Sequence, residues 1–383
     1  MTSNPAVSRS IPGIPEQYAT RMAFFVAGLG TAAWAPLVPY AKARLVLDDG
    51  TLGLLLLCLG AGSILSMPVA GLVAARYGCR LVISLAMVVL CLILPGLAVI
   101  SHTPTFIIAL LLFGASIGII DVVINIQAVI VEKAAGKTMM SGFHGLFSLG
   151  GIVGASGVAG LLWLGLSPLQ AMLAVCTIVL VALLTLGKHL LPYATEQQGP
   201  TFVMPHGIIL FIGFLCFVCF LAEGAMLDWS AVFLTSVRNL DPAYAGLGYA
   251  AFAMTMTIGR LSGDYLVRIL GGVTTLAVGG LIAAGGFIVC VTIPATSAAF
   301  LGFAMIGLGA SNVVPVLYSA TGRQTVMPPH LAVAAVTTFG YSGILSGPAL
   351  IGFIAHGTSL QTAFLCVAAM LLLLPAFCRI AAR

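Results

Sequence analysis

The chain has 383 residues, of which 61% are hydrophobic and 7% are charged, and its mean hydropathy is +1.17. Because a soluble domain carries about 25% charged residues, this composition excludes one and indicates a protein that crosses a membrane many times. The formal net charge of +5 comes from Lys and Arg residues that are scattered singly, so we expect no basic patch and no nucleic-acid partner.

Breaks in the apolar pattern at Gly, Pro and charged residues divide the chain into segments long enough to cross a bilayer, which takes roughly 20 apolar residues. Transmembrane β-strands would need only about 9 to 11 alternating residues each, and no such alternation is present. We therefore predict an all-α membrane protein with twelve transmembrane helices. The predicted spans are 21–41, 51–75, 81–101, 105–132, 139–164, 168–190, 207–236, 244–268, 273–293, 296–322, 331–355 and 359–380.

Positive charges flank these spans unevenly, and cytoplasmic ends are expected to carry the excess of Lys and Arg. With the N-terminus inside, all of the 15 Lys and Arg residues fall at or near the inner face except Lys42, Arg44 and Arg238. Residues 1–20 are polar and lack the apolar core of a cleavable signal peptide. We predict a cytoplasmic tail over 1–20 and two cytoplasmic termini.

The first span contains Thr31, Trp34, Pro36 and Pro39 in its outer half. Proline bends a helix, and the polar and aromatic side chains suit a water-filled cavity better than lipid. We expect this helix to be bent and Trp34 to line the cavity.

Two stretches repeat at half the chain length. Gly71 precedes Arg76 by five residues at the end of the second span, and Gly263 precedes Arg268 by five at the end of the eighth, an offset of 192 residues. Internal repeats of this kind are common in secondary transporters. The predicted organisation is therefore an N-terminal six-helix bundle, a cytoplasmic central loop and a C-terminal six-helix bundle, over 21–190, 191–206 and 207–383.

Polar side chains are distributed unevenly over the predicted helices. The third, sixth, ninth and twelfth spans contain no charged residue within the apolar run, so we expect them to face lipid. The remaining polar residues indicate helices that line a shared aqueous space. They are Asp121, Asn125, His144, Ser148, Glu223, Asp228, Arg260, Asn312, Tyr318, Thr337, Thr338, Tyr341 and Ser342.

The loop after the second span resembles the G-x-x-x-D-R-x-G-R motif of the major facilitator superfamily. Gly71, Arg76, Gly78 and Arg80 match the motif, whereas Ala75 stands where the family usually has Asp. The stretches SGFHGLFSLGG and AEGAMLDWS resemble the bacterial YbjJ/MosC-like branch of that superfamily. The resemblance implies two pseudo-symmetric six-helix bundles, a monomer in the bacterial inner membrane, and a small polar solute that is sugar-like or cyclitol-like.

The apolar run 211–234 carries two carboxylates, Glu223 and Asp228. A charged side chain at the bilayer centre costs several kcal/mol, so it usually faces water or a partner. Asp228 is about 140° round an ideal helix from Glu223, so the two need not share a face. Asp228 contacts either the substrate or one of the outer-face cations Lys42, Arg44 and Arg238.

Asp121 and Asn125 are four residues apart and therefore share one face of the fourth helix. They either line the cavity as a proton or substrate site, or make a helix-packing hydrogen bond. We group them with Glu223, Asp228, Trp34, Asn312 and Tyr341 as the candidate cavity residues.

The candidate inner gate comprises the motif residues and the polar residues near the inner ends of the fifth and eighth helices. His144 either bridges neighbouring helices or lines the inner vestibule. Arg260 and Asp264, four residues apart, either form a local ion pair or contribute to the gate. The full set is Gly71, Arg76, Gly78, Arg80, His144, Arg260, Asp264 and Arg268.

The residues favour a proton-linked secondary transporter working by alternating access, with Glu223 or Asp121 as the coupling carboxylate. Its expected partners are a small solute, protons and the lipid bilayer. The alternatives are a uniporter, a drug or metabolite efflux antiporter of the same fold, and a transport-inactive membrane sensor or scaffold. No enzyme motif is recognisable, and we expect no cofactor and no metal, because Cys216 and Cys219 lie within an apolar helix.

Overall fold

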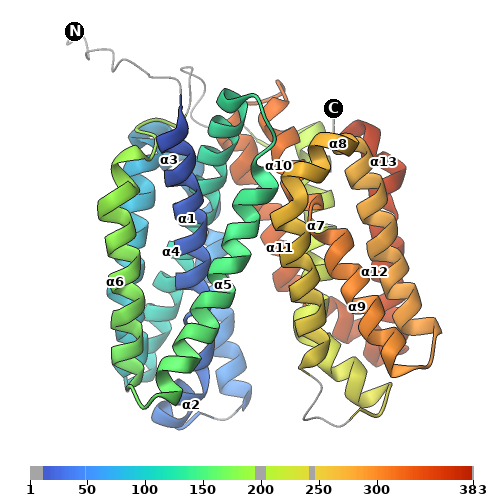
Figure 1. Ribbon diagram of the computed structural model, residues 1–383. Helices are drawn as coiled ribbons and strands as arrows, with labels where there is room; N and C mark the ends of the chain where they lie inside the picture. Colours follow the sequence, from blue (N-terminus) through green and yellow to red (C-terminus); the bar gives the residue numbers. More distant parts are fainter. Residues whose placement is uncertain (1–11, 48, 195–203, 241–245, 382–383) are drawn as a thin grey trace.

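The computed structural model describes residues 12–47, 49–194, 204–240 and 246–381, and within these ranges the ordered elements are all helices. Figure 1 shows two bundles side by side, one made by α1 to α6 and the other by α7 to α13. The start of α1 and the end of α13 lie at the same end of the molecule, which we call the termini end. Residues 1–11 of the predicted tail, with Arg9, and residues 195–203 of the predicted central loop lie outside the described residues, as does Arg383.

The first bundle begins earlier than expected. Its first helix starts at Ile14, because Pro15 suits the first turn and the Glu16 carboxylate accepts the backbone N–H of Gly13 at 2.7 Å. A short 3-10 turn at Pro36 then divides this helix, as the prolines predict. The elements are α1 (Ile14–Ala32), η1 (Ala35–Leu37), α2 (Val38–Leu45), α3 (Asp49–Val99), α4 (Thr103–Ala135), α5 (Met140–Trp163), α6 (Pro168–Leu186) and η2 (Gly187–His189).

The second bundle has the same plan, with a break of its own in the tenth predicted span. Asn312 separates two helices there, with a backbone φ of −107° and ψ of 1°. The elements are α7 (Ile208–Ser236), α8 (Leu247–Thr292), α9 (Thr296–Ala310), α10 (Val313–Arg323), α11 (Pro329–Gly357), α12 (Leu360–Leu371) and α13 (Leu373–Ala381).

Two of these elements, α3 and α8, are hairpins of two helices. Gly78 (φ 81°) and Gly271 (φ 78°) interrupt them in a conformation that glycine adopts readily and other residues rarely do. Nine segments of the described chain are long and apolar enough to cross a membrane, and two of them contain these glycines. The two legs of α3 and of α8 can be counted as separate spans, and α1 with α2 as one more. The described segments then agree with the twelve predicted spans.

A pair of arginines shows how closely the two halves correspond. Arg44, just before α3, donates to carbonyl oxygens at the end of that hairpin, and Arg238, just before α8, does the same at the end of the other. Cationic side chains are favourable at helix C-termini because the last carbonyls lack partners. Arg44 binds Leu97 (2.7 Å), Ala98 (2.6 Å) and Ile100 (2.9 Å), and Arg238 binds Cys290 (2.5 Å), Val291 (3.2 Å) and Ile293 (3.0 Å).

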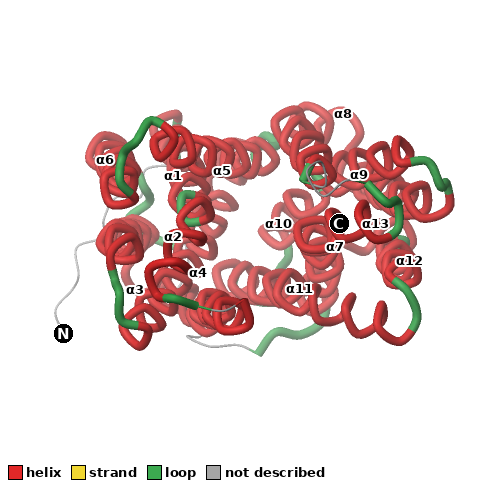
Figure 2. Tube along the Cα trace, turned by 90° about the horizontal axis from the view of Figure 1, so that it is seen from below, coloured by secondary structure: helices red, strands yellow, loops and turns green. Residues whose placement is uncertain are grey.

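The two bundles meet along two helix pairs, α3 with α11 and α5 with α8 (Figure 2). Gly71 of α3 lies so close to α11 that a Cβ there would run into the carbonyl of His330, and Gly145 of α5 lies equally close to Leu261 of α8. Small residues allow such close approach between membrane helices. From these contacts α5 and α8 diverge toward the end opposite the termini (Figure 1).

Candidate functional site

An ion pair joins two helices of the second bundle, α7 and α8. Glu223, near the middle of α7, and Arg260, in the first leg of α8, approach to 3.0 Å between Oε1 and Nη2, with side chains 15% and 10% exposed. Mid-helix charges this well buried need a partner, because removal from water costs several kcal/mol per ion. Within the described ranges this is the one carboxylate–cation pair for which a distance is recorded.

Arg260 also reaches the other bundle. Its Nη1 donates to the Ser148 hydroxyl of α5 at 3.0 Å, and its Nε donates to the Ser311 carbonyl at 3.4 Å. Ser148 in turn donates to the carbonyl of His144 at 3.2 Å. One guanidinium therefore ties α7, α8 and the break before α10 to α5 of the opposite half.

Asp121, near the middle of α4, is the mid-helix carboxylate of the first bundle. It is partly exposed and lies within electrostatic range of Tyr318 and Tyr341. The bond that links it to Asn125 runs from the amide of Asn125 to the Asp121 backbone carbonyl, at 2.9 Å, and so leaves the carboxylate unused. In the described part of the chain no cation or donor partner of that carboxylate is recorded.

Asn125 and His144 contact each other. This agrees with the interpretation of each residue as part of a contact between helices. Asn125 is fully buried, and its Oδ1 lies 3.2 Å from Nε2 of His144. The histidine ring packs between Phe24, at 5.3 Å between centroids, and Tyr318, at 5.6 Å. His144 thus bridges α4, α5 and α10 and does not line an open vestibule.

Two predicted cavity residues are packed elsewhere. Trp34 is 5% exposed and lies against Phe106 and Phe113, so it belongs to the apolar core of the first bundle. Asn312 is 6% exposed and donates to the Gly259 carbonyl at 3.0 Å, which fixes α10 against α8. Both residues lie at breaks between helices and make interhelical contacts in this conformation, so their place in the cavity stays a prediction.

Tyr341 remains a candidate for the cavity. Its ring lies 6.0 Å from that of Phe220, and it is within electrostatic range of both Asp121 and Glu223. The two carboxylates, Arg260 and these two aromatic rings therefore combine charge, hydrogen-bonding groups and flat apolar surface between the two bundles. Binding sites for small polar molecules usually have this mixture.

Asp228 makes no recorded bond to this cluster in the described residues. Its side chain is exposed, and no hydrogen bond or ion pair of its carboxylate is recorded in the described residues. The expectation that Arg44 or Arg238 would be its partner is wrong, because both guanidiniums bind the carbonyls at helix ends. A free C-terminal carbonyl in the membrane is a strong acceptor, and both arginines lie directly beside such ends.

A second polar cluster lies where α5 begins, at the termini end. Met139, at the N-cap position, offers no side-chain acceptor for the first amides of this helix. Glu132 at the end of α4 supplies one instead, since its Oε2 accepts the backbone N–H groups of Met139 and Met140 at 2.8 Å each. Its other oxygen accepts the hydroxyl of Ser319 in α10 at 2.5 Å, so this carboxylate joins the two halves.

Asp264 of α8 approaches the same helix start from the other half. Its carboxylate lies against the backbone amides of Ser141 and Gly142, and a Cβ on Gly142 would collide with it. The hydroxyl of Thr138 donates to the Asp264 carbonyl at 2.9 Å. The predicted alternative of an Arg260–Asp264 ion pair is wrong, because Asp264 is attracted by the N-terminus of α5 while Arg260 is paired with Glu223.

The remaining motif residues act mostly within one half. Gly78 makes the turn of α3, and Arg80 donates through Nε to the Leu190 carbonyl at 2.8 Å. The guanidinium of Arg76 lies 5.3 Å from the ring of Tyr77, and that of Arg268 lies 5.4 Å from the ring of Tyr265. Among the four motif residues, Gly71 is the one with a recorded contact to the opposite half.

The sequence-based prediction missed Glu132, Thr138 and Ser319. The signal that could have identified Glu132 is the poor N-cap at Met139, since a helix start without an acceptor needs one from a neighbouring segment. Ser319 carried no comparable signal, because its contact depends on the way the two halves meet. Across the described ranges no cluster of three or more His, Cys, Asp or Glu side chains is placed to hold a metal.

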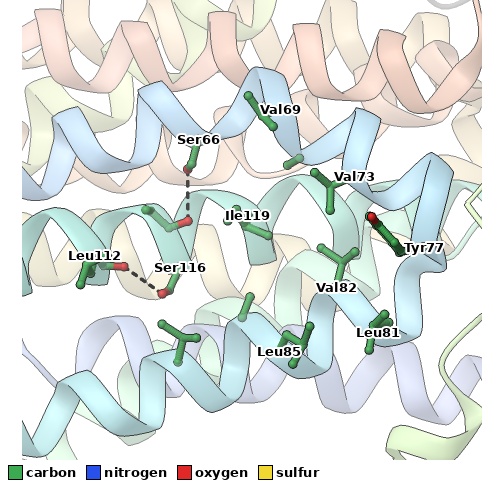
Figure 3. Close-up of a pocket in the computed structure, with 14 residues that line it drawn as sticks. Ser66, Val69, Val73, Tyr77, Leu81, Val82, Leu85, Leu112, Ser116 and Ile119 are labelled. Atoms are coloured by element: carbon green, nitrogen blue, oxygen red, sulfur yellow. Dashed lines mark hydrogen bonds between the residues drawn. The ribbon is translucent and has the colours of Figure 1, made fainter. Parts of the chain in front are cut away.

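An apolar groove on the first bundle lies outside this region (Figure 3). It has a volume of about 610 Å³ and is lined by 14 residues of α3 and α4, with Tyr77 at one end. Its two serines, Ser66 and Ser116, already donate to the carbonyls of Ala115 and Leu112. Because it is apolar and confined to one half within the membrane-crossing region, bilayer hydrocarbon suits it and a polar solute does not.

The family model of the Major Facilitator Superfamily matches residues 22–332. An uncharacterized MFS-type transporter of Yersinia pestis is 59% identical over 373 residues, which cover 97% of each chain. Membrane protein MosC of Rhizobium meliloti is 30% identical over 377 residues, or 96% of this chain and 89% of that one.

Solved structures show the same fold at much lower sequence identity. The Escherichia coli fucose:proton symporter FucP superposes with a TM-score of 0.79 at 14% identity, covering 98% of this chain and 100% of that one. The proton:xylose symporter XylE superposes with a TM-score of 0.75 at 13% identity, covering 96% and 95%.

Proposed function

This chain belongs to the Major Facilitator Superfamily, and from that premise we propose that it carries a small polar solute across the bacterial inner membrane by alternating access, coupled to protons. The observation that carries the proposal is the bond from Arg260 to Ser148, which connects an intramembrane ion pair in one half to a helix of the other. Charge in the cavity can thereby act on the contact between the halves.

We place the termini end in the cytoplasm, which makes this conformation open to the outside. Two features support that orientation. The excess of Lys and Arg falls at this end, as expected for a cytoplasmic face. The cross-half contacts of Gly71, Glu132 and Asp264 also cluster there, so this end is closed while α5 and α8 diverge at the other (Figure 1).

The Glu223–Arg260 pair is the element that we propose senses the solute. A solute entering from the outer side reaches Glu223 and Arg260 beside Tyr341. Its hydroxyl groups compete for the hydrogen bonds that Arg260 makes to Glu223 and Ser148. Losing the bond to Ser148 weakens the contact between α5 and α8 and favours opening of the inner end, because a ligand shifts a conformational equilibrium only by its difference in affinity for the two states.

Asp121 is the carboxylate that we propose carries the coupling proton. A proton on Asp121 removes a charge that has no recorded counter-ion. A proton on Glu223 would instead leave the charge of Arg260 buried without its partner. Loss of one partner of a buried ion pair is strongly destabilising. The unpaired carboxylate therefore cycles between charged and neutral forms, and the paired one stays charged.

The solute class follows from the lining of the site and from the solved relatives. Carboxylates and a guanidinium bind hydroxyl groups, while the rings of Phe220 and Tyr341 provide flat apolar contacts. The two solved relatives described above are a fucose:proton symporter and a proton:xylose symporter. We propose a sugar-like or cyclitol-like solute.

The test is uptake by the purified protein in proteoliposomes, screened with sugars and cyclitols in the presence and absence of an imposed pH gradient. We expect one of these solutes to accumulate against its gradient only when the pH gradient is present. Equal counterflow with and without the gradient would instead identify a uniporter. Binding without any transport by the intact chain would favour the sensor or scaffold.

A further inference from the structure

The apolar groove between α3 and α4 (Figure 3) lies outside the proposed transport site. Its shape follows from the size of its side chains. The small residues Ala70, Ala86 and Ser116 are buried and form its floor, whereas larger residues such as Leu85 and Leu112 are exposed at its edges. Its volume of about 610 Å³ falls within the range of ligand-binding pockets. The groove is therefore large enough to seat one molecule in a defined place.

The groove has the length of one leaflet of a bilayer. Along the first leg of α3 its lining runs from Ser66 to Tyr77, which spans about 16 Å at the rise of an α-helix. Half of the hydrocarbon core is about 15 Å thick. The turn that follows Tyr77 lies at the termini end, since α2 precedes α3 at the opposite end (Figure 1). The groove thus extends from the membrane surface toward the bilayer centre, as an acyl chain does.

Two arginines adjoin the surface end of the groove. Arg76 directly precedes Tyr77, and Arg80 directly precedes Leu81, which also lines the groove. Both arginines are exposed, and the guanidinium of Arg76 lies 5.3 Å from the centre of the Tyr77 ring. Ala75 supplies no acid at this turn, and no ion pair of either arginine is recorded in the described residues. The positive charge here is therefore open to an anion from outside the chain.

An apolar groove that ends at cations matches a molecule with a hydrocarbon chain and an anionic head. Arginine binds phosphate through charge-assisted hydrogen bonds. The recorded bond of Arg80, to the Leu190 carbonyl, uses Nε and leaves its two terminal nitrogens for such contacts. We propose that the groove seats an acyl chain of an anionic phospholipid whose phosphate binds Arg76 and Arg80.

The bound lipid would brace the first bundle. Its site is made by both legs of α3 and by α4, so one acyl chain contacts three membrane-crossing segments of the same half. A ligand that binds only the folded state stabilises it. Because no residue of the second half lines the groove, binding should not depend on which end of the transporter is open.

The first experiment locates the acyl chain by fluorescence quenching. In a cysteine-free background, a bimane label is attached at Leu112→Cys, at the other end of the groove from Tyr77 (Figure 3), and the full-length protein is placed in phosphatidylcholine vesicles. A small fraction of phosphatidylglycerol with a nitroxide on its acyl chain should quench this label about threefold more than nitroxide phosphatidylcholine, because the choline group offsets the phosphate charge. A label at Leu184→Cys, an exposed position on α6, should be quenched equally by both lipids.

Three results of this experiment would overturn the proposal. Equal quenching by the two lipids at Leu112→Cys would show that the groove does not select an anionic lipid. The same preference at Leu184→Cys would show that the whole bundle surface attracts the lipid. Weaker quenching by both lipids at Leu112→Cys than at Leu184→Cys would show that a protein segment covers the groove.

The second experiment asks whether the cations and the groove hold the same molecule. Arg76→Gln, which removes no recorded hydrogen bond, should reduce the preference for phosphatidylglycerol at Leu112→Cys by about half or more, and Arg76→Gln/Arg80→Gln should abolish it. Arg379→Gln, an exposed cation on α13, should leave it unchanged. An undiminished preference in the double variant would overturn the proposal. None of these readouts requires the transported solute, so they can fail while the transport function stands.

Discussion

The two contacts that close the termini end differ in chemistry. Between α5 and α8 the contact is polar, with Arg260 bonded to Ser148 and Asp264 against the first amides of α5. Between α3 and α11 it consists of glycines packed against apolar side chains and a carbonyl, and no hydrogen bond recorded in the described residues joins these two helices. We call them the polar seam and the apolar seam.

This difference suggests a division of roles. Polar contacts are sensitive to one proton or one competing hydroxyl group, whereas a close-packed apolar contact responds to shape and volume. We infer that the polar seam receives the signal from the cavity, and that the apolar seam follows it by sliding or separating. Variants at each seam therefore test this division of roles.

The largest effect is expected from breaking the ion pair behind the polar seam. Arg260→Met leaves Glu223 buried without a counter-ion, which costs about 3 to 5 kcal/mol in known cases. The thermal midpoint of the purified protein should fall markedly and transport should be lost. The double variant Arg260→Met/Glu223→Gln should recover most of the midpoint and no transport, since it removes both charges. A double variant less stable than Arg260→Met would contradict this account.

The apolar seam should be most sensitive to volume. Gly71→Leu places a side chain where a Cβ already meets the His330 carbonyl, and overpacking of this kind typically costs about 1 to 3 kcal/mol. We expect the termini end to remain open, seen as faster alkylation of a buried cysteine at Ser141 in the polar seam. The matched control is Gly157→Leu on α5, where nothing lies within 4 Å of the added Cβ. Equal alkylation in both variants would show that the apolar seam does not control closure.

Charge reversal at the polar seam should have a smaller but specific effect. Asp264→Lys replaces a carboxylate at the N-terminus of α5 by a cation, which reverses an interaction worth about 1 kcal/mol with the helix dipole and amides. Transport should fall more than in Ala75→Lys, which alters the motif position that lacks its usual acid. Near-normal uptake in both variants would remove Asp264 from the gate.

The sequence predicted the two related halves of the molecule better than the contacts between their helices. The repeated Gly71–Arg76 and Gly263–Arg268 pairs correctly indicated two related halves, which the caps by Arg44 and Arg238 also show. Each Gly–Arg pair lies within one short segment, so comparison of the two halves of the sequence is enough to identify the repeat.

Contacts between helices were harder to predict. Arg260 has Asp264 four residues away on its own helix, yet its partner is Glu223 on α7. Trp34 and Asn312 lie at breaks between helices, and the packing of neighbouring elements buries them. Which carboxylate meets which cation depends on how helices are arranged side by side, and no spacing along one chain segment encodes that.

The smallest effect is expected at Ser148. Ser148→Ala removes the side-chain hydrogen bond that is recorded between Arg260 and α5 in the described residues, worth about 1 kcal/mol. The thermal midpoint should hardly change, while the termini end should open more readily, which distance measurements between spin labels on α5 and α8 can detect. Ser156→Ala, whose hydroxyl is bonded within its own helix, serves as the control and should leave the distances unchanged. A shift of the same size in the control would remove Ser148 from the signal path.

The central claim is that the unpaired carboxylate carries the proton while the paired one holds the polar seam. It is tested most directly by comparing Asp121→Asn with Glu223→Gln in proteoliposomes loaded with the transported solute. Asp121→Asn should exchange labelled for unlabelled solute at a rate near that of the parent, yet fail to accumulate it under a pH gradient. Glu223→Gln should be impaired in both exchange and accumulation. Accumulation driven by the pH gradient in Asp121→Asn, together with its loss and intact exchange in Glu223→Gln, would reverse the two roles and contradict the account.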